Sequence, residues 1–208
     1  MSGFDRDAAT VPLREGSSST FRRLLVVVTG SPSAADMPAC LYVLRQLRPE
    51  LQIRVVLTRS AARFVTPAAL QHRVGTPVLA DSWETTDTPV HVELAAWAEA
   101  ALVMPATLDY LSRLARGGGD SPSVLALQCT AVPVVVAPGL PPGAVEGPAY
   151  RAHWEALTAR PNTAVLPPVE ALSVGAGETF VGAPGPIDEA LDLLEHLAAR
   201  PGDRSGQP

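Results

Sequence analysis

Short runs of apolar, mostly β-branched residues alternate with helical patterns along most of the chain. The runs lie at 24–28, 53–57, 101–104 and 132–137, and a segment with apolar residues at helical spacing follows each of them. Nearly continuous apolar runs are typical of strands that are buried on both faces of a parallel sheet. The pattern therefore predicts an α/β fold, a doubly wound and mostly parallel sheet in a flavodoxin-like or Rossmann-like three-layer sandwich.

Polar segments without periodicity mark both ends of the predicted domain. Residues 1–21 and 201–208 have few apolar residues and predict disordered tails. The chain has 208 residues, of which 47% are apolar, and this is enough for one sizeable core. We therefore expect a single domain over residues 22–200.

Composition excludes several classes of function. The net charge of −5 provides no basic surface for nucleic acid. The apolar runs are too short to cross a membrane, and the first residues lack the pattern of a secretion signal, so we expect neither a membrane span nor secretion. The chain has no lysine, which rules out a pyridoxal-phosphate Schiff base and a phosphate-binding lysine. Cys40 and Cys129 predict reduced core residues in a cytoplasmic protein, and we expect no metal site.

The turn after the first apolar run has the composition of a phosphate-binding turn. Gly30 permits close approach of the backbone, and the hydroxyls of Ser31 and Ser33 can donate to a phosphate at a helix N-terminus. Ser33 is also the expected N-cap of the helix at 34–47. The turn lacks the Gly-x-Gly-x-x-Gly spacing and so favours a mononucleotide over a dinucleotide. An ordinary strand–helix turn is the alternative.

The segment at 91–107 carries a resemblance to a known family. Residues 91–98 read His-Val-Glu-Leu-Ala-Ala-Trp-Ala, and the following apolar strand ends in Pro-Ala-Thr at 105–107. These residues resemble the His-Ile-Glu-Leu-x-x-Trp-Ala-Asp and Pro-Ala-Ser-Ala-Asn-Thr blocks of the flavin-containing cysteine decarboxylases. That family includes phosphopantothenoylcysteine decarboxylase and the epidermin-type peptidyl-cysteine decarboxylases. The resemblance implies FMN as cofactor and a decarboxylation as the reaction.

The resemblance also assigns roles to individual residues. The turn with Gly30, Ser31 and Ser33 is implied to hold the FMN. His91 matches the catalytic histidine of the family, and an imidazole that titrates near neutral pH suits a base. The other residues implied to contact the flavin or its phosphate are Thr58, Ser60, Phe64, Pro105, Ala106, Thr107 and Leu108. Without the resemblance, His91 would be interpreted as a surface histidine and Phe64 as a core residue.

The second half of the chain departs from the family pattern. Asp109 stands where the family has asparagine, and the substrate-binding asparagine of the family falls on Pro141, whose side chain makes no hydrogen bond. We still expect the loop with Leu140 and Pro141 to line the substrate site. Either its glycine amides or Arg151 would then bind the substrate carboxylate. No cysteine follows Cys129 that could reduce an enethiol, so the resemblance implies an enethiol as the final product.

The leading hypothesis is an FMN-dependent enzyme that oxidatively decarboxylates the C-terminal cysteine of a ribosomally made precursor peptide. The aminoenethiol product would then close into an aminovinylcysteine ring, as in lanthipeptide-like natural products. Three alternatives are phosphopantothenoylcysteine decarboxylase of coenzyme A biosynthesis, a non-catalytic flavin-fold binding subunit, and a flavin prenyltransferase. Relatives assemble as trimers or as four trimers, so the resemblance implies a cytoplasmic homotrimer or homododecamer.

Overall fold

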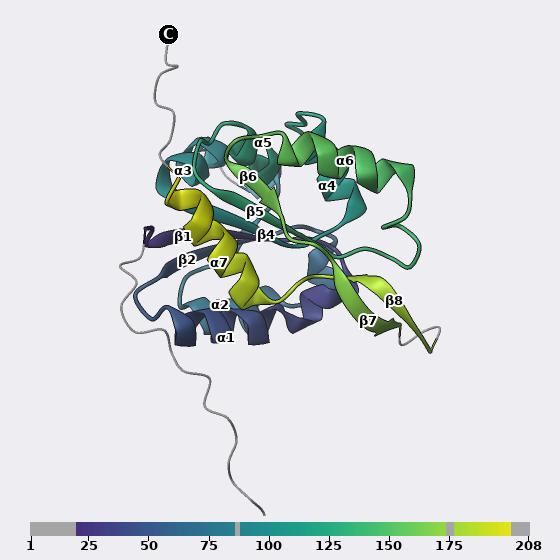
Figure 1. Cartoon of the computed structure of the whole chain (residues 1–208). Coiled ribbons are helices and arrows are strands. Elements are labelled where there is room, and N and C mark those ends of the chain that lie inside the picture. The colour runs from purple at the N-terminus through teal and green to yellow at the C-terminus, as the bar shows by residue number, and fades with distance from the viewer. Residues whose placement is uncertain (1–19, 86–87, 174–176, 201–208) are drawn as a thin grey trace, which may run out of the picture.

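The computed structural model describes residues 20–85, 88–173 and 177–200, and Figure 1 shows how their elements are arranged. In this part of the chain, six parallel strands form one sheet and two antiparallel strands form a separate hairpin. The strands are β1 (Arg23–Val28), β2 (Gln52–Leu57), β3 (Leu79–Ala80), β4 (Ala100–Ala106), β5 (Val134–Pro138), β6 (Thr163–Val165), β7 (Val169–Ser173) and β8 (Glu178–Ala183). The helices are α1 (Met37–Leu47), α2 (Pro67–Val74), α3 (Val90–Trp97), α4 (Leu108–Ala115), α5 (Pro122–Gln128), α6 (Pro148–Thr158) and α7 (Ile187–Ala198).

Helices cover both faces of the sheet, as the sequence pattern predicts. The helices α1, α2 and α7 pack on one face, and α3, α4, α5 and α6 pack on the other (Figure 1). The strand order β3-β2-β1-β4-β5-β6 reverses between β1 and β4. With all six strands this is the Rossmann order, and without the two-residue β3 it is the flavodoxin order. The predicted fold class is confirmed.

Alternate residues of the central strand β1 supply the two halves of the core. Leu24, Val26 and Val28 belong to the apolar cluster on the α1 face. Leu25 and Val27 belong to the cluster on the α4 face. Each of these side chains is at most 1% exposed. The run is apolar at every position because helices cover both faces of the strand.

One helix start differs from the sequence prediction. The first helical segment begins with a 3-10 turn, Pro32–Asp36, so Ser33 lies inside this turn and is not an N-cap. After β2 there is only a single 3-10 turn, Ala61–Arg63, and the Ser60 side chain makes no capping hydrogen bond. Both serines therefore keep their hydroxyls free of the helix-capping role.

The helix α2 and the hairpin β7–β8 are not predicted by the sequence pattern. Pro67 begins α2, where proline is tolerated because the first helical position needs no N–H. The Thr66 hydroxyl caps this helix by accepting a hydrogen bond from Ala69 N (3.2 Å). The hairpin is joined to the loop after β5, where Leu140 N donates to the carbonyl of Gly182 (2.7 Å).

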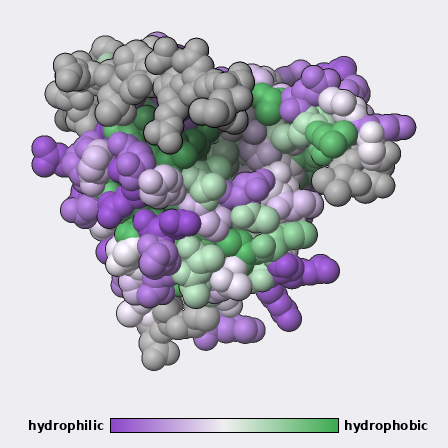
Figure 2. Space-filling model, turned by 90° about the horizontal axis from the view of Figure 1, so that it is seen from below, coloured by the Kyte–Doolittle hydropathy of each residue, from purple (hydrophilic) through white to green (hydrophobic). Residues whose placement is uncertain are grey.

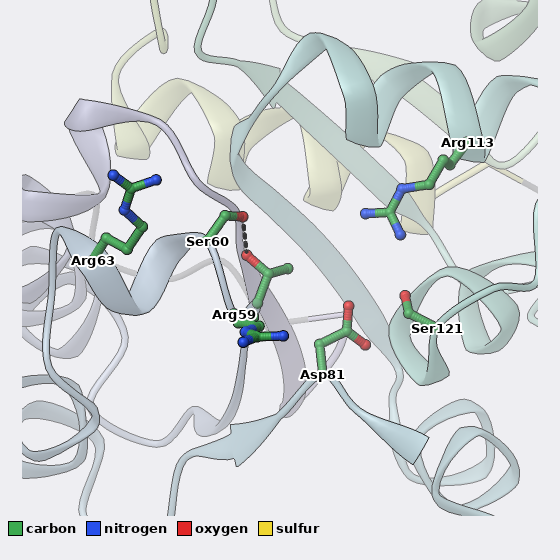
Figure 3. Close-up of a pocket in the computed structure, with 7 residues that line it drawn as sticks. Arg59, Ser60, Arg63, Asp81, Arg113 and Ser121 are labelled. Atoms are coloured by element: carbon green, nitrogen blue, oxygen red, sulfur yellow. Dashed lines mark hydrogen bonds between the residues drawn. The ribbon is translucent and has the colours of Figure 1, made fainter. Parts of the chain in front are cut away.

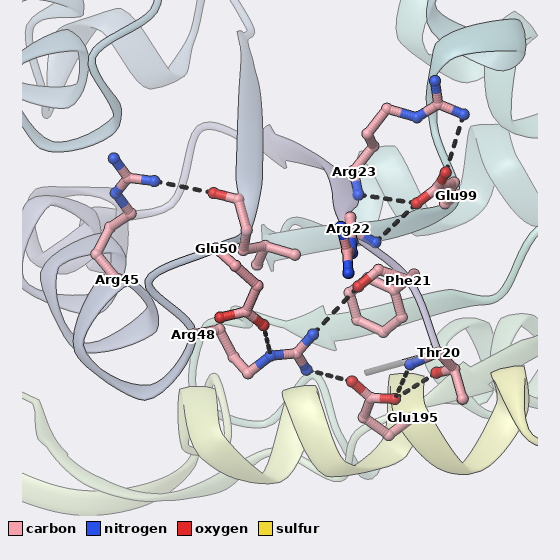
Figure 4. Close-up of polar contacts among 10 residues, drawn as sticks. Thr20, Phe21, Arg22, Arg23, Arg45, Arg48, Glu50, Glu99 and Glu195 are labelled. Carbon is pink, nitrogen blue, oxygen red and sulfur yellow. Dashed lines mark hydrogen bonds and ion pairs between the residues drawn. The ribbon is translucent and has the colours of Figure 1, made fainter. Parts of the chain in front are cut away.

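The N-terminal end of the domain is held by Arg48, which follows α1. Its guanidinium forms an ion pair with Glu195 of α7 and donates to the carbonyl of Phe21 (3.1 Å; Figure 4). Thr20 N also donates to the Glu195 carboxylate (3.2 Å), and Phe21 is only 2% exposed. The prediction of a tail up to residue 21 is therefore wrong for Thr20 and Phe21, because both are held against α7. The rest of the two predicted tails lies outside the described residues.

The two cysteines are free thiols. Cys40 is half-buried and Cys129 is exposed, so the prediction that both are core residues is wrong. Burial raises the pKa of the Cys40 thiol. Among the described residues, no helix is both long and apolar enough to span a membrane. The same residues contain no group of three or more histidine, cysteine or carboxylate side chains that could hold a metal ion.

Candidate cofactor and substrate site

The ends of β1, β4 and β5 are joined at the point where the strand order reverses. The Thr29 hydroxyl donates to the carbonyl of Pro105 (2.6 Å) and accepts from Thr107 N (2.9 Å). Gly139 N donates to the carbonyl of Ala106 (2.8 Å). In open α/β sheets, ligands bind in the crevice at the carboxyl ends of the strands at such a switch point. The candidate site is therefore expected along this edge.

Gly30 brings the turn after β1 against the turn after β2. A Cβ atom at Gly30 would lie 2.4 Å from both Cβ and Oγ of Ser60, so only glycine fits here without displacement. Ser60 Oγ lies 3.2 Å from Thr58 Oγ1. Ser31 is buried beside the loop after β5, where a Cβ at Gly139 would lie 2.9 Å from its hydroxyl oxygen. The structure thus brings Gly30, Thr58 and Ser60 together, with Ser31 next in the same turn.

A cavity of about 490 Å³ lies beside this junction (Figure 3). Its walls come from the turn after β2, the end of β3, the helix α4 and the start of α5, and they carry hydroxyls and charges. The lining residues are Thr58, Arg59, Ser60, Arg63, Asp81, Arg113 and Ser121. Sequence reasoning identified Thr58 and Ser60 but missed the charged residues. Arg59 precedes Ser60 and Arg63 follows it by three residues, and these positions were a usable signal.

Two carboxylates hold the Arg113 side chain at the cavity wall. Its guanidinium lies 2.9 Å from an oxygen of Asp120 and 3.1 Å from an oxygen of Asp109. Burial lowers the pKa of Arg113, but the hydrogen bond and charge of Asp120 outweigh this, and the pKa lies above its ordinary value. Asp109, which replaces the asparagine of the family, therefore contributes an ion pair. On the other side of the cavity, Asp81 Oδ1 accepts from Ser123 N at the start of α5 (2.8 Å).

One lining residue has a buried polar atom without a partner. Ser121 Oγ is buried and has no hydrogen-bond partner among the described residues. Burying a hydroxyl is unfavourable unless it is hydrogen-bonded, so this atom indicates a ligand that enters the cavity. Arg59 and Arg63 are exposed and form no ion pair within the described part of the chain. Their charges are therefore available to an anionic group.

The remaining predicted flavin contacts lie outside the cavity wall. Phe64 is 41% exposed and lines neither this cavity nor a second one of about 240 Å³ beside α2. Pro105 and Ala106 are buried, and their carbonyls accept the hydrogen bonds that join the strand ends. The Thr107 hydroxyl caps α4, and Leu108 is half-buried in the core on that face. Contacts of these residues with a flavin stay predictions, as does the role of the half-buried Ser33.

His91 lies at the start of α3 and lines neither cavity. Its Nδ1 is buried and has no hydrogen-bond partner in the described part of the chain. The Trp83 ring contacts it edge to face, with the ring centroids 5.4 Å apart and an interplanar angle of 73°. The structure thus does not place His91 in the cavity of its own chain, and its role as a base stays a prediction.

The loop after β5 has fewer free amides than the sequence predicts. Gly139 and Leu140 donate their N–H groups to backbone carbonyls (2.8 and 2.7 Å), and Pro141 and Pro142 have none. Of the two glycines in the segment 139–143, Gly143 is the one whose N–H has no backbone partner among the described residues. The Leu140 side chain is 4% exposed and packs in the core on the α4 face. Its contact with a substrate stays a prediction.

Two further substrate residues were predicted in the second half of the chain. Pro141 is exposed at the start of its loop, and Arg151 is exposed on α6. Neither residue lines either cavity. Their contacts with a substrate stay predictions.

A doubly wound sheet with a polar cavity at the carboxyl ends of its strands is typical of nucleotide-binding α/β proteins. More specifically, the chain belongs to the Flavoprotein family, whose model matches residues 13–198. Cypemycin cysteine dehydrogenase (decarboxylating) of Streptomyces sp is 39% identical over 158 residues, which make up 75% of this chain and 82% of that relative. The family expected from the segment at 91–107 is confirmed.

Solved structures with similar folds include two decarboxylases. The crystal structure of the cypemycin decarboxylase CypD has a TM-score of 0.71 and 34% sequence identity, and the match covers 86% of this chain and 94% of that one. The FMN-dependent cysteine decarboxylase SpaF has a TM-score of 0.71 and 27% identity, and the match covers 85% of this chain and 97% of that one.

The residues around the cavity fit a flavin mononucleotide. The Thr58 and Ser60 hydroxyls can donate to a phosphate, and Arg59 and Arg63 can balance its charge. The unpartnered hydroxyl of Ser121 can supply a further polar contact from the cavity wall. A cavity of about 490 Å³ is also in the range of cofactor sites.

Proposed function

We propose that this chain is an FMN-dependent decarboxylase that oxidises the C-terminal cysteine of a ribosomally made precursor peptide. The observation that carries the proposal is the polar cavity at the carboxyl ends of β2 and β3, beside the switch point, in a chain of the Flavoprotein family. The 39% identity to a relative described as a cysteine dehydrogenase (decarboxylating) supports the reaction class. The likeness to an FMN-dependent cysteine decarboxylase supports the cofactor.

The proposed reaction removes carbon dioxide and two hydrogens from the terminal cysteine and yields an aminoenethiol. When bound, FMN supplies the two-electron oxidant for the cysteine side chain. The residues of the turns at Gly30 and Ser60 hold its phosphate, and the Arg63 guanidinium balances the phosphate charge. His91 accepts a proton from the substrate, a task that suits an imidazole at neutral pH. Closure of the product into an aminovinylcysteine ring requires a separate cyclising activity.

The proposal includes assembly of the chain into a homotrimer or homododecamer in the cytoplasm. Because His91 lies outside the cavity of its own chain, it fits a site that a second copy completes. Exposed apolar side chains are available for such contacts, and Tyr42, Val43 and Leu47 of α1 are between 36% and 51% exposed. On the face seen in Figure 2, apolar surface is interspersed with hydrophilic side chains. The free cysteines agree with a reducing compartment.

Purified protein and a synthetic peptide with a C-terminal cysteine test this function. We expect a yellow protein that releases FMN on denaturation, and loss of carbon dioxide and two hydrogens from the peptide in mass spectra. In His91→Asn, flavin content should be unchanged while turnover falls by roughly 10²- to 10⁴-fold, the usual contribution of general acid–base catalysis. A colourless protein that binds no FMN would contradict the proposal.

The same assay separates the alternatives. Turnover of 4′-phosphopantothenoylcysteine with no turnover of the peptide would assign the chain to coenzyme A biosynthesis. FMN binding with neither activity would indicate a non-catalytic flavin-binding subunit.

A further inference from the structure

The candidate base has an unusual environment. A catalytic imidazole is commonly fixed by a hydrogen bond from its second ring nitrogen to a carbonyl or carboxylate. In His91 the Nδ1 atom is buried, yet it has no such partner among the described residues. The orientation of the ring must therefore come from packing. Its aromatic neighbour is Trp83, at 5.4 Å between ring centroids and near-perpendicular to it.

Trp83 is itself fixed by a hydrogen bond. Its indole Nε1 donates to the backbone carbonyl of Asp120 (2.9 Å), at the start of α5. The Asp120 side chain accepts from Arg113 (2.9 Å), and the next residue is Ser121. Both Arg113 and Ser121 line the cavity. A continuous set of contacts therefore runs from the cavity wall through Asp120 and Trp83 to His91.

Burial does not explain the presence of this tryptophan. Trp83 is 46% exposed and lies in a one-turn 3-10 segment, outside both apolar clusters of the core. A tryptophan stabilises a fold chiefly through the large apolar area that it buries, and here about half of the side chain faces solvent. Its two directed contacts, one to a carbonyl and one to an imidazole, are better suited to orienting a neighbour.

We propose that Trp83 is a positioning residue, which holds the His91 imidazole in the orientation needed for proton transfer and ties it to the wall of the cofactor cavity. The proposal rests on the proposed function, because it requires His91 to act as the base. Small displacements of a catalytic group cost rate without weakening binding of the cofactor. Trp83 should therefore affect kcat much more than KM or FMN affinity.

The test compares Trp83→Ala, Trp83→Leu and Trp83→Phe in the FMN-loaded protein with a synthetic Cys-terminal peptide. We expect kcat to fall by about 10- to 100-fold in the alanine and leucine variants, with KM and FMN content unchanged. Phenylalanine keeps a ring against His91 and should restore much of the lost rate. Val92→Ala is the matched control, because Val92 is 53% exposed on the same helix, beside His91.

A double-mutant cycle decides whether Trp83 acts through His91. In the His91→Asn background, Trp83→Ala should cause no further loss of kcat, because there is no imidazole left to orient. An NMR measurement gives a readout that does not depend on activity. The imidazole proton signal that is missing from the spectrum of His91→Asn belongs to His91. In Trp83→Ala this signal should lose the shift that the ring current of the indole causes.

Three results would overturn the proposal. Independent, multiplicative losses in the double variant would show that Trp83 supports the fold and not the base, while the proposed function would still hold. A wild-type kcat in Trp83→Ala would overturn the positioning role directly. Full activity of His91→Asn would remove His91 as the base and with it the positioning role of Trp83, while the proposed decarboxylase function would still hold.

Discussion

Replacing Gly30 by alanine tests the contact on which the candidate site depends. The added Cβ would lie 2.4 Å from Cβ and Oγ of Ser60 and 3.0 Å from its carbonyl carbon. Carbon atoms in contact are about 3.5–4.0 Å apart, so the turns after β1 and β2 must separate by about 1 Å. Overpacking of this kind costs about 1–3 kcal/mol of unfolding free energy. For a domain of this size, that lowers Tm by about 2–12 °C.

The same substitution should weaken FMN binding, because the hydroxyl of Ser60 is displaced from the cavity. We expect FMN affinity to fall at least about tenfold, or about 1.4 kcal/mol, in a fluorescence titration. Adding Ser60→Gly removes the two closest atoms, so the double variant should regain stability in urea denaturation but not FMN affinity. Gly119→Ala is the control, because its Cβ would meet only a Leu125 methyl, at 3.3 Å. Unchanged Tm and FMN affinity in Gly30→Ala would refute the reasoning.

Three further predictions concern the core and the second half of the chain. Tyr110→Phe leaves the buried Ser123 hydroxyl without its 2.8 Å partner and should cost about 1–3 kcal/mol in urea denaturation, more than the double variant with Ser123→Ala. Burial raises the pKa of Tyr110 above its usual range and that of Tyr150 to about 12. Stability should therefore be fully present below about pH 10 and fall as the pH rises toward 12, less steeply in Tyr110→Phe, as measured by thermal melts at each pH. Pro141→Asn should leave turnover of a Cys-terminal peptide unchanged, whereas Arg151→Ala should raise KM by the equivalent of one charge-assisted hydrogen bond, about 1.5–3 kcal/mol. Faster turnover in Pro141→Asn would show instead that the loop is a degraded binding motif.

The sheet and half of the cavity wall could be predicted because they depend on short stretches of sequence. The continuous apolar run at 24–28 already indicates a strand covered on both faces. The turns with Gly30 and Ser60 follow neighbouring parallel strands, and parallel strands present their carboxyl ends at one edge of the sheet. The approach of these two turns therefore follows from topology alone.

The other half of the wall could not be predicted, because it depends on packing between distant segments. Asp81 follows β3 and Arg113 lies on α4, and no local sequence pattern predicts that these two side chains line the same cavity. Leu140 was expected to face the substrate because it follows a central strand. Its N–H is instead bonded to the hairpin β7–β8, and its side chain is buried. The hairpin was not predicted, so neither of these contacts could be anticipated.

The Arg48–Glu195 ion pair also determines where the domain can be attached to something else. It holds Thr20 against the last turns of α7, so the first described residues and the end of α7 lie together beside the amino end of β1 (Figure 4). The cavity lies at the opposite, carboxyl edge of the sheet. A tag or a fused enzyme joined directly to Thr20 or Arg200 would therefore be attached on the side away from the cavity.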